Sequence, residues 1–151
     1  MYTCSDHTSC IEDALKNADL ICRNKGLRFT PIRKIILEMI WASHNPIKAY
    51  DILDLLQKKF STARPTTVYR SIDFLIENGF IHKLNGLSAY VGCSHPQAHK
   101  NCYFLICNDC GSIEECFDDN LTQIINTTSN TRKFEPDKIT IEVQGKCQGC
   151  H

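Results

Sequence analysis

The chain has 151 residues, of which 42% are hydrophobic and 23% are charged, and its formal net charge is zero. This hydrophobic content is sufficient for a folded core and argues against disorder of the whole chain. The lack of net charge argues against an indiscriminate nucleic-acid binder. The charge is unevenly divided: residues 1–84 hold 12 basic and 9 acidic side chains, and residues 85–151 hold 5 and 8. These signs favour an N-terminal part that contacts phosphate and a C-terminal part that binds cations.

Ten cysteines in a chain of this length would indicate a disulfide scaffold if the protein were secreted. Residues 1–14, however, lack the basic segment and apolar run of a signal peptide. No stretch approaches the ~18 apolar residues that span a bilayer. We therefore expect a cytoplasmic protein with reduced thiols and no membrane partner, whose cysteines bind metal.

Two Cys-x-x-Cys pairs stand in the C-terminal half, Cys107 with Cys110 and Cys147 with Cys150. Together they can offer four thiolates in a tetrahedron, which suits a structural Zn²⁺. Gly111 permits the tight backbone around such an ion. A redox function of the two pairs is the alternative. The 36 residues between the pairs exceed a compact zinc ribbon, so we expect strand and helix between them.

The N-terminal part is predicted to form helices followed by a hairpin. Apolar residues recur at helical spacing over 9–25, from Pro31 to the break at Asn45-Pro46, over 48–60, and from Pro65 to 78. The last two helices have helix-turn-helix spacing. Segments 80–84 and 88–91 flank an Asn-Gly pair, which favours a hairpin. This order predicts a winged helix.

A helix-turn-helix inserts its second helix into the major groove. On the polar face of the helix at 65–78, Arg70 can donate to a guanine edge or a phosphate. Thr66, Thr67 and Tyr69 can reach phosphate oxygens. The same pattern is equally compatible with an amphipathic helix whose polar face is merely solvated.

Residues 92–101 have the composition of a linker and are rich in metal-ligating side chains. Beyond them, strands are expected over 103–106, 112–116 and 138–143, with a helix over 118–128. A unit of about 50 residues has little core of its own, so metal binding and dimerisation would both stabilise it. The sequence therefore predicts an α+β chain with an N-terminal winged helix and a small C-terminal α/β domain.

Several sequence segments resemble the ferric uptake regulator family of metal-dependent repressors. They are Arg28-Phe29-Thr30-Pro31-Ile32-Arg33, Ala49-Tyr50-Asp51-Ile52-Leu53, Arg64-Pro65-Thr66-Thr67-Val68-Tyr69-Arg70, and both cysteine pairs in order. The resemblance implies a homodimer with a DNA-binding domain at 1–91, a hinge at 92–101, and a dimerisation domain with the Cys₄ zinc at 102–151.

For a repressor of this kind, we expect seven residues to contact double-stranded operator DNA. Tyr50 and Arg70 are expected to carry sequence information. The remaining candidates are expected to hold the DNA backbone: Arg28, Arg33, Thr66, Thr67 and Tyr69.

Four further features carry a resemblance within the family: Phe80-Ile81-His82-Lys83, Tyr90-Val91-Gly92-Cys93, His99, and Cys110-Gly111-Ser112-Ile113-Glu114-Glu115. In these, the chain looks most like the zinc uptake regulators. The ligands implied for a second, regulatory zinc ion are His82, Cys93, His99 and Glu115. This mixed set of nitrogen, sulfur and oxygen suits tetrahedral Zn²⁺. His95 competes with His99 for its position, and Glu114 competes less strongly with Glu115.

The resulting hypothesis is a repressor of zinc-uptake genes that holds two zinc ions per subunit and has no small-molecule substrate and no enzymatic activity. The closest alternative is a sensor of iron, manganese or peroxide on the same scaffold. A zinc-dependent hydrolase or deaminase is less favoured, because no substrate-pocket motif accompanies the ligands. A thiol redox switch that uses the two Cys-x-x-Cys pairs is also less favoured.

Overall fold

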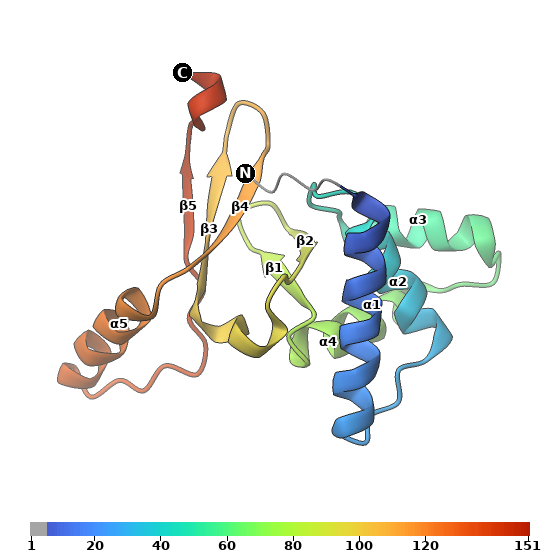
Figure 1. Ribbon diagram of the computed structural model, residues 1–151, viewed down its shortest axis with the longest axis horizontal. Coiled ribbons are helices and arrows are strands. Elements are labelled where there is room, and N and C mark those ends of the chain that lie inside the picture. The colour runs from blue at the N-terminus through green and yellow to red at the C-terminus, as the bar shows by residue number, and fades with distance from the viewer. Residues whose placement is uncertain (1–5) are drawn as a thin grey trace. The chain divides into compact units, whose positions relative to one another are not determined.

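The computed structural model describes residues 6–151, except for the side chains of residues 98–100. The chain forms two compact units, which we call the N-terminal unit, up to Pro96, and the C-terminal unit, from Gln97 to His151. Each unit is described by itself (Figure 1). The hinge assigned to residues 92–101 stays a prediction.

The N-terminal unit contains four helices followed by a two-stranded sheet. The helices are α1 (His7–Asn24), α2 (Pro31–Trp41), α3 (Ala49–Lys59) and α4 (Pro65–Glu77). The start of α1 lies earlier than the expected residue 9, because the Asp6 carboxylate accepts a hydrogen bond from the Thr8 amide. Thr30 caps α2 as expected and Pro31 occupies its first turn. After α4, Gly79 takes the positive φ of 74° that ends the helix.

The sheet of this unit is the predicted wing. Strands β1 (Ile81–Leu84) and β2 (Ala89–Gly92) pair antiparallel, with His82 opposite Val91. A turn over residues 85–88 joins them, and Ser88 rather than Gly86 has positive φ, at 49°. Ile47 adds a short bridge to Tyr90, so the segment between α2 and α3 is hydrogen-bonded to the wing.

The helices and the wing enclose one apolar core. Nine aliphatic side chains of this core, from α2, α3, α4 and β1, are essentially inaccessible: Ile36, Leu37, Ile40, Ile52, Leu56, Val68, Ile72, Leu75 and Ile81. Each buried side chain of this size contributes about 1.5–3 kcal/mol to folding. The apolar faces read from the sequence are the faces that are buried, and the predicted winged helix is confirmed.

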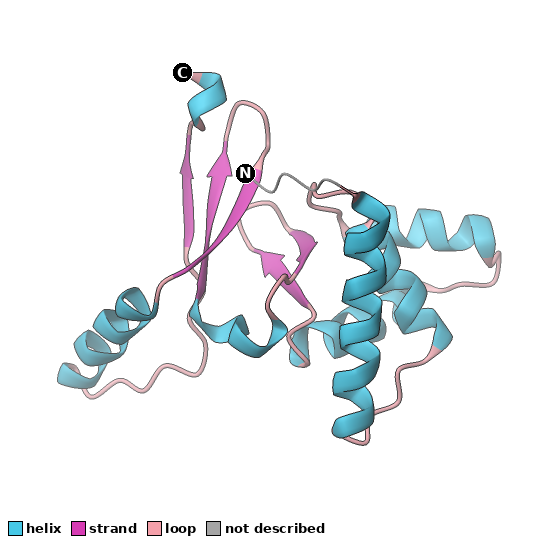
Figure 2. Cartoon of the chain, viewed as in Figure 1, coloured by secondary structure: helices cyan, strands magenta, loops and turns pink. Residues whose placement is uncertain are grey.

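The C-terminal unit is a three-stranded sheet with helices at its connections (Figure 2). It contains η1 (Pro96–Asn101), β3 (Cys102–Cys107), β4 (Ile113–Phe117), α5 (Asp119–Thr131), β5 (Glu142–Gly145) and η2 (Gln148–Cys150). The strand order is β4-β3-β5, with β4 antiparallel and β5 parallel to the central β3. Parallel pairing needs a crossover connection, which α5 and the segment after it supply.

The expected strand over 138–143 was wrong in its position, since β5 lies over Glu142–Gly145. The parallel register explains the shift, because β5 begins opposite Phe104 and its last residue lies opposite Cys107. Period-two alternation identified a strand but not the segment that β3 can pair. The helix expected over 118–128 begins after Asp118 and continues to Thr131. No helix in the described part of the chain has the length and apolar character that a bilayer crossing requires.

Candidate metal centres and DNA-binding surface

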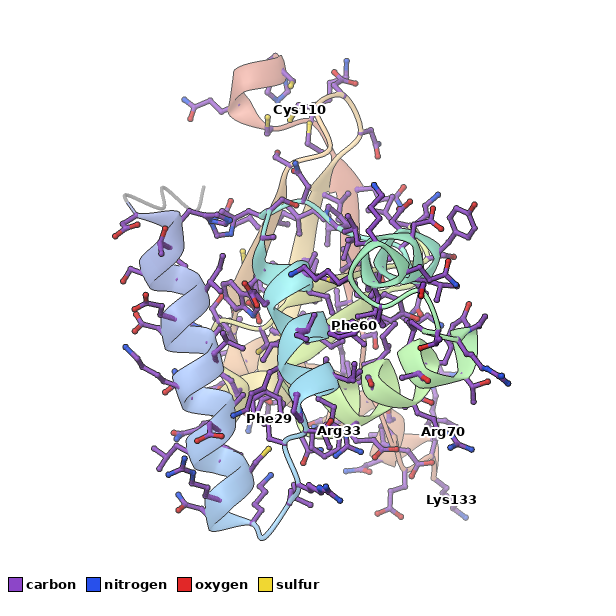
Figure 3. All side chains as sticks on the ribbon, turned by 90° about the vertical axis from the view of Figure 1, so that its right-hand side faces the viewer. Phe29, Arg33, Phe60, Arg70, Cys110 and Lys133 are labelled. Carbon is purple, nitrogen blue, oxygen red and sulfur yellow. The ribbon has the colours of Figure 1, made fainter. Side chains whose placement is uncertain are left out.

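The two Cys-x-x-Cys pairs meet at one end of the sheet. In the first pair, Cys107 ends β3 and Cys110 lies in the turn after it. In the second, Cys147 precedes η2 and Cys150 ends it. The parallel pairing of β3 with β5 brings the two pairs together. The Asn108 amide donates to the Gly145 carbonyl at 2.8 Å and closes this end. Figure 3 shows the sulfur atoms gathered at Cys110. Gly111 has a φ of 72°, the positive value expected for the tight turn.

The four sulfur atoms form a set with the dimensions of a zinc site. The Sγ atoms of Cys107, Cys110, Cys147 and Cys150 all lie within 4.8 Å of one another. The Cys110 and Cys147 sulfurs are 3.7 Å apart. Four sulfurs at the Zn–S bond length of ~2.3 Å in a tetrahedron are ~3.8 Å apart. These residues therefore fit a structural Zn²⁺.

The electrostatics of the cluster favour a bound cation. The backbone amides of Cys110 and Cys147 donate to the Cys107 sulfur and lower the pKa of that thiol to about 6. The Ser112 hydroxyl, 3.2 Å from the Cys110 sulfur, lowers the pKa of Cys110. The neighbouring Cys147 sulfur raises the pKa of Cys150 to about 12. Four clustered thiols cannot all ionise unless a cation compensates their charge.

Two residues that the sequence did not single out also join the two Cys-x-x-Cys pairs. The Lys146 ammonium lies 3.2 Å from the Asp109 carboxylate, and each residue sits inside or beside a different Cys-x-x-Cys pair. Ser112, which the sequence also did not single out, contacts only the first pair, through the Cys110 sulfur and the Cys107 amide. Opposite charges flanking the two pairs were a sequence signal for this contact, but only the fold shows that the pairs are neighbours.

A second group of ligand atoms lies in the wing. His82 comes from β1 and Cys93 directly follows β2, and both are buried, at 7% and 4% exposure. Their ligand atoms lie within 4.8 Å of each other. The Cys93 amide donates to the Phe80 carbonyl at 2.9 Å, which fixes the backbone of Cys93 beside β1. One nitrogen and one sulfur donor at this spacing fit a shared Zn²⁺.

The other predicted ligands have different outcomes. The His99 side chain lies outside the described residues. Among the described ligand types in the N-terminal unit, the exposed His95 does not group with His82 and Cys93.

The two candidate glutamates, Glu114 and Glu115, are neighbours on β4, so their side chains point to opposite faces of the sheet. Glu115 is partly buried opposite Phe104, whereas Glu114 is exposed opposite Leu105. Either glutamate belongs to the C-terminal unit, so its part in the wing site stays a prediction.

The predicted DNA-binding residues of α4 lie on one exposed surface at its start. Thr66, Thr67, Tyr69 and Arg70 are all exposed, whereas Val68 between them is buried. Figure 3 shows Arg70 extending from this helix. Tyr50, in the first turn of α3, is 70% exposed. This geometry is that of a helix-turn-helix with a free recognition surface.

The two arginines near the start of α2 differ in their surroundings. Arg28 is exposed. Arg33 is partly buried, donates to the Arg28 carbonyl, and lies over the ring of Phe74 in α4. Arg33 thus has an intramolecular role that the sequence did not indicate.

Comparison with known proteins agrees with this architecture. Residues 24–144 match the model of the ferric uptake regulator family. The chain belongs to the ferric uptake regulator family. It is 35% identical to the zinc uptake regulation protein of Escherichia coli over 141 residues, which cover 92% of this chain and 82% of that protein.

Two solved structures of the family are similar over nearly the whole chain. One is a zinc uptake regulator complexed with zinc and DNA, with a TM-score of 0.88 and 34% identity, covering 93% of this chain and 94% of that chain. The other is holo XcZur, with a TM-score of 0.84 and 37% identity, covering 90% of this chain and 95% of that chain. The fold inferred from the sequence is therefore that of the family.

Proposed function

We propose that this chain is a zinc-responsive transcriptional repressor that binds operator DNA as a homodimer. The observation that carries the proposal is the buried His82–Cys93 pair in the wing of a winged helix. A thiolate beside an imidazole favours zinc over hard metals that prefer oxygen. The similarity to a zinc uptake regulator complexed with zinc and DNA supports the same function.

We assign a different role to each of two zinc ions per subunit. Cys107, Cys110, Cys147 and Cys150 would hold a permanent ion that stabilises the C-terminal unit, because binding at such a site adds to folding free energy. His82 and Cys93, with His99 and Glu115, would hold the regulatory ion. When bound, that zinc ion would be shared by four ligands from different segments of the chain.

The ligand set itself suggests how zinc and DNA are coupled. His82 and Cys93 belong to the wing, and Glu115 belongs to the C-terminal unit. Ligands drawn from both units restrict the freedom of one unit relative to the other. A dimer restricted in this way presents its two α4 helices at one spacing, which matches two half-sites. By linkage, DNA must then raise the affinity for zinc as much as zinc raises the affinity for DNA.

Exposed apolar side chains of the C-terminal unit support the homodimer. None of the residues of α5 is buried, and Ile124 on this helix is 62% exposed. Phe134 and Val143 are 64% and 48% exposed. A second copy of the chain covering these side chains would remove them from water. Light scattering should give a dimer for the native chain and a monomer for Ile124→Lys.

The test of zinc responsiveness is DNA binding at controlled free zinc. The native protein should bind a DNA fragment that it selects from a random pool only when the regulatory zinc is loaded. Cys93→Ser should abolish the zinc dependence, whereas the matched control Cys10→Ser, a partly exposed cysteine of the same unit, should keep it. Normal zinc dependence in Cys93→Ser would favour the alternative of a metal held by oxygen and nitrogen.

A further inference from the structure

The chain has a single tryptophan, Trp41 at the end of α2, and its ring packs against Gly92 at the end of β2. A Cβ added to Gly92 would lie 2.7 Å from Cζ2 of the ring and still closer to Cε2 and Nε1. Real Cβ atoms essentially never approach so closely. Gly92 therefore leaves room for the ring, and the ring occupies that room completely.

Shape rather than hydrogen bonding holds the ring in place. The Trp41 Nε1 atom is buried and has no hydrogen-bond partner among the described residues. The edge of the indole that carries Nε1 is the edge that meets Gly92. A second ring, His44, lies edge-on to Trp41 with centroids 6.4 Å apart. The indole is thus fixed by the surfaces around it.

Cys93 directly follows the glycine that the ring contacts. Its amide donates to the Phe80 carbonyl on the β1 side. Trp41 also borders a small cavity of about 50 Å³ that Cys93 and Ser94 line. The backbone of residues 92 and 93 is therefore held between a hydrogen bond to Phe80 and the Nε1 edge of the indole ring.

We propose that Trp41 and Gly92 form a size-matched pair that positions the Cys93 thiolate for the regulatory metal. Trp41 is a positioning residue in this account and does not touch the ion. A ligand atom has to be held to within about 0.5 Å of its productive position, and residues that support ligands typically change metal affinity 10–100-fold when altered. This inference rests on the proposed function, because it concerns the affinity of the same zinc site.

The test compares Gly92→Ala, Trp41→Leu and the double variant, each with its structural zinc retained. Gly92→Ala should weaken zinc binding at the regulatory site about 10–100-fold, because the added methyl group displaces the strand end. Trp41→Leu should weaken it about tenfold, because the strand end loses its support. The double variant should bind zinc more tightly than either single variant, since leucine in place of the indole leaves room for the methyl group. Gly145→Ala, where a Cβ meets nothing within 4 Å, is the matched control.

Three measurements separate positioning from general destabilisation. Competition with a chromophoric chelator gives the zinc affinity, and urea unfolding gives the stability of each variant. The thiolate-to-cobalt absorption band of the Co²⁺-substituted site reports the Cys93 geometry. A shift of this band in variants that unfold like the native chain supports positioning.

Two outcomes overturn the inference: native zinc affinity in Trp41→Leu, or a double variant no better than Gly92→Ala. If Gly92→Ala does not fold, the zinc affinity of Trp41→Leu alone tests the positioning role. If the native chain has no second zinc that Cys93→Ser removes, the proposed function itself fails. A native second zinc with an unaffected Trp41→Leu variant instead removes only the positioning role.

Discussion

The guanidinium carbon of Arg33 lies 3.6 Å from the centroid of the Phe74 ring, a contact that joins α2 to α4, the second helix of the helix-turn-helix. Cation–π contacts of this kind contribute about 0.5–2 kcal/mol, depending on how far they are desolvated. Arg33 therefore helps to fix α4 in the N-terminal unit. Any contact that it makes with a DNA phosphate is additional to this packing role.

Arg33→Ala is expected to lower the free energy of unfolding by about 0.5–2 kcal/mol, because Phe74 loses the stacked cation. Arg33→Lys should keep the charge and recover part of the DNA affinity but little of the stacking. Urea unfolding and DNA titration of both variants measure the two effects. A fully stable Arg33→Ala variant with weak DNA binding would instead make Arg33 a phosphate contact only.

Arg70 has a different expected role, since it is exposed at the start of α4. Arg70→Ala should cost about 1–3 kcal/mol of discrimination at one base pair if the guanidinium reads a guanine edge. Affinities for a selected DNA site and its single-base variants give this value. Arg132→Ala in the C-terminal unit is the control. An equal loss of affinity for every DNA sequence would instead mean that Arg70 contacts a phosphate.

Local sequence signals predicted much of the fold. Helix periodicity, the Thr30 cap and the proline that follows it located α2, and the same kind of pattern located α3 and α4. The two Cys-x-x-Cys pairs predicted the cysteine cluster, because the spacing within each pair is local. The family resemblance supplied His82 and Cys93, which the structure brings together.

The sequence did not predict contacts between segments that are far apart in the chain. The position of β5 depends on its parallel partner β3, and alternation within β5 does not encode that register. The contacts of Arg33 with Phe74 and of Trp41 with Gly92 join residues far apart in the chain. Their side-chain types alone do not reveal such partners, because tertiary packing creates them.

The cysteine cluster predicts a distinct effect of removing one ligand. Cys110→Ser should lose the structural zinc and unfold the C-terminal unit, because zinc at such sites supplies about 10–16 kcal/mol of apparent binding free energy in zinc-finger peptides. Zinc content and limited proteolysis measure the outcome. Cys116→Ser, on β4 outside the cluster, should keep both the structural zinc and the resistance to proteolysis. Equal zinc content in both variants would contradict the Cys₄ assignment.

The pH dependence of stability should contain a contribution from His44. His44 is an exposed residue, but partial desolvation of its ring lowers its pKa below the ordinary value of 6.5, and nearby His7 lowers it further. The folded state then binds fewer protons than the unfolded state, so this contribution is complete above pH 6.5 and is lost as the pH falls through the folded pKa.

His44→Asn removes this titration. Its melting temperature should therefore fall less steeply than that of the native chain as the pH is lowered below 6.5. Thermal unfolding by circular dichroism across this range provides the comparison. Parallel curves for the two proteins would contradict the assignment to His44.

The central claim is that one zinc ion is structural and a second controls DNA binding. The most direct test measures zinc content per subunit and binding to a selected DNA site, before and after mild chelation. We predict that one zinc remains, DNA binding is lost, and added zinc restores it better than ferrous iron or manganese. DNA binding that survives chelation, or that iron or manganese restores better, would contradict zinc control while leaving the fold intact.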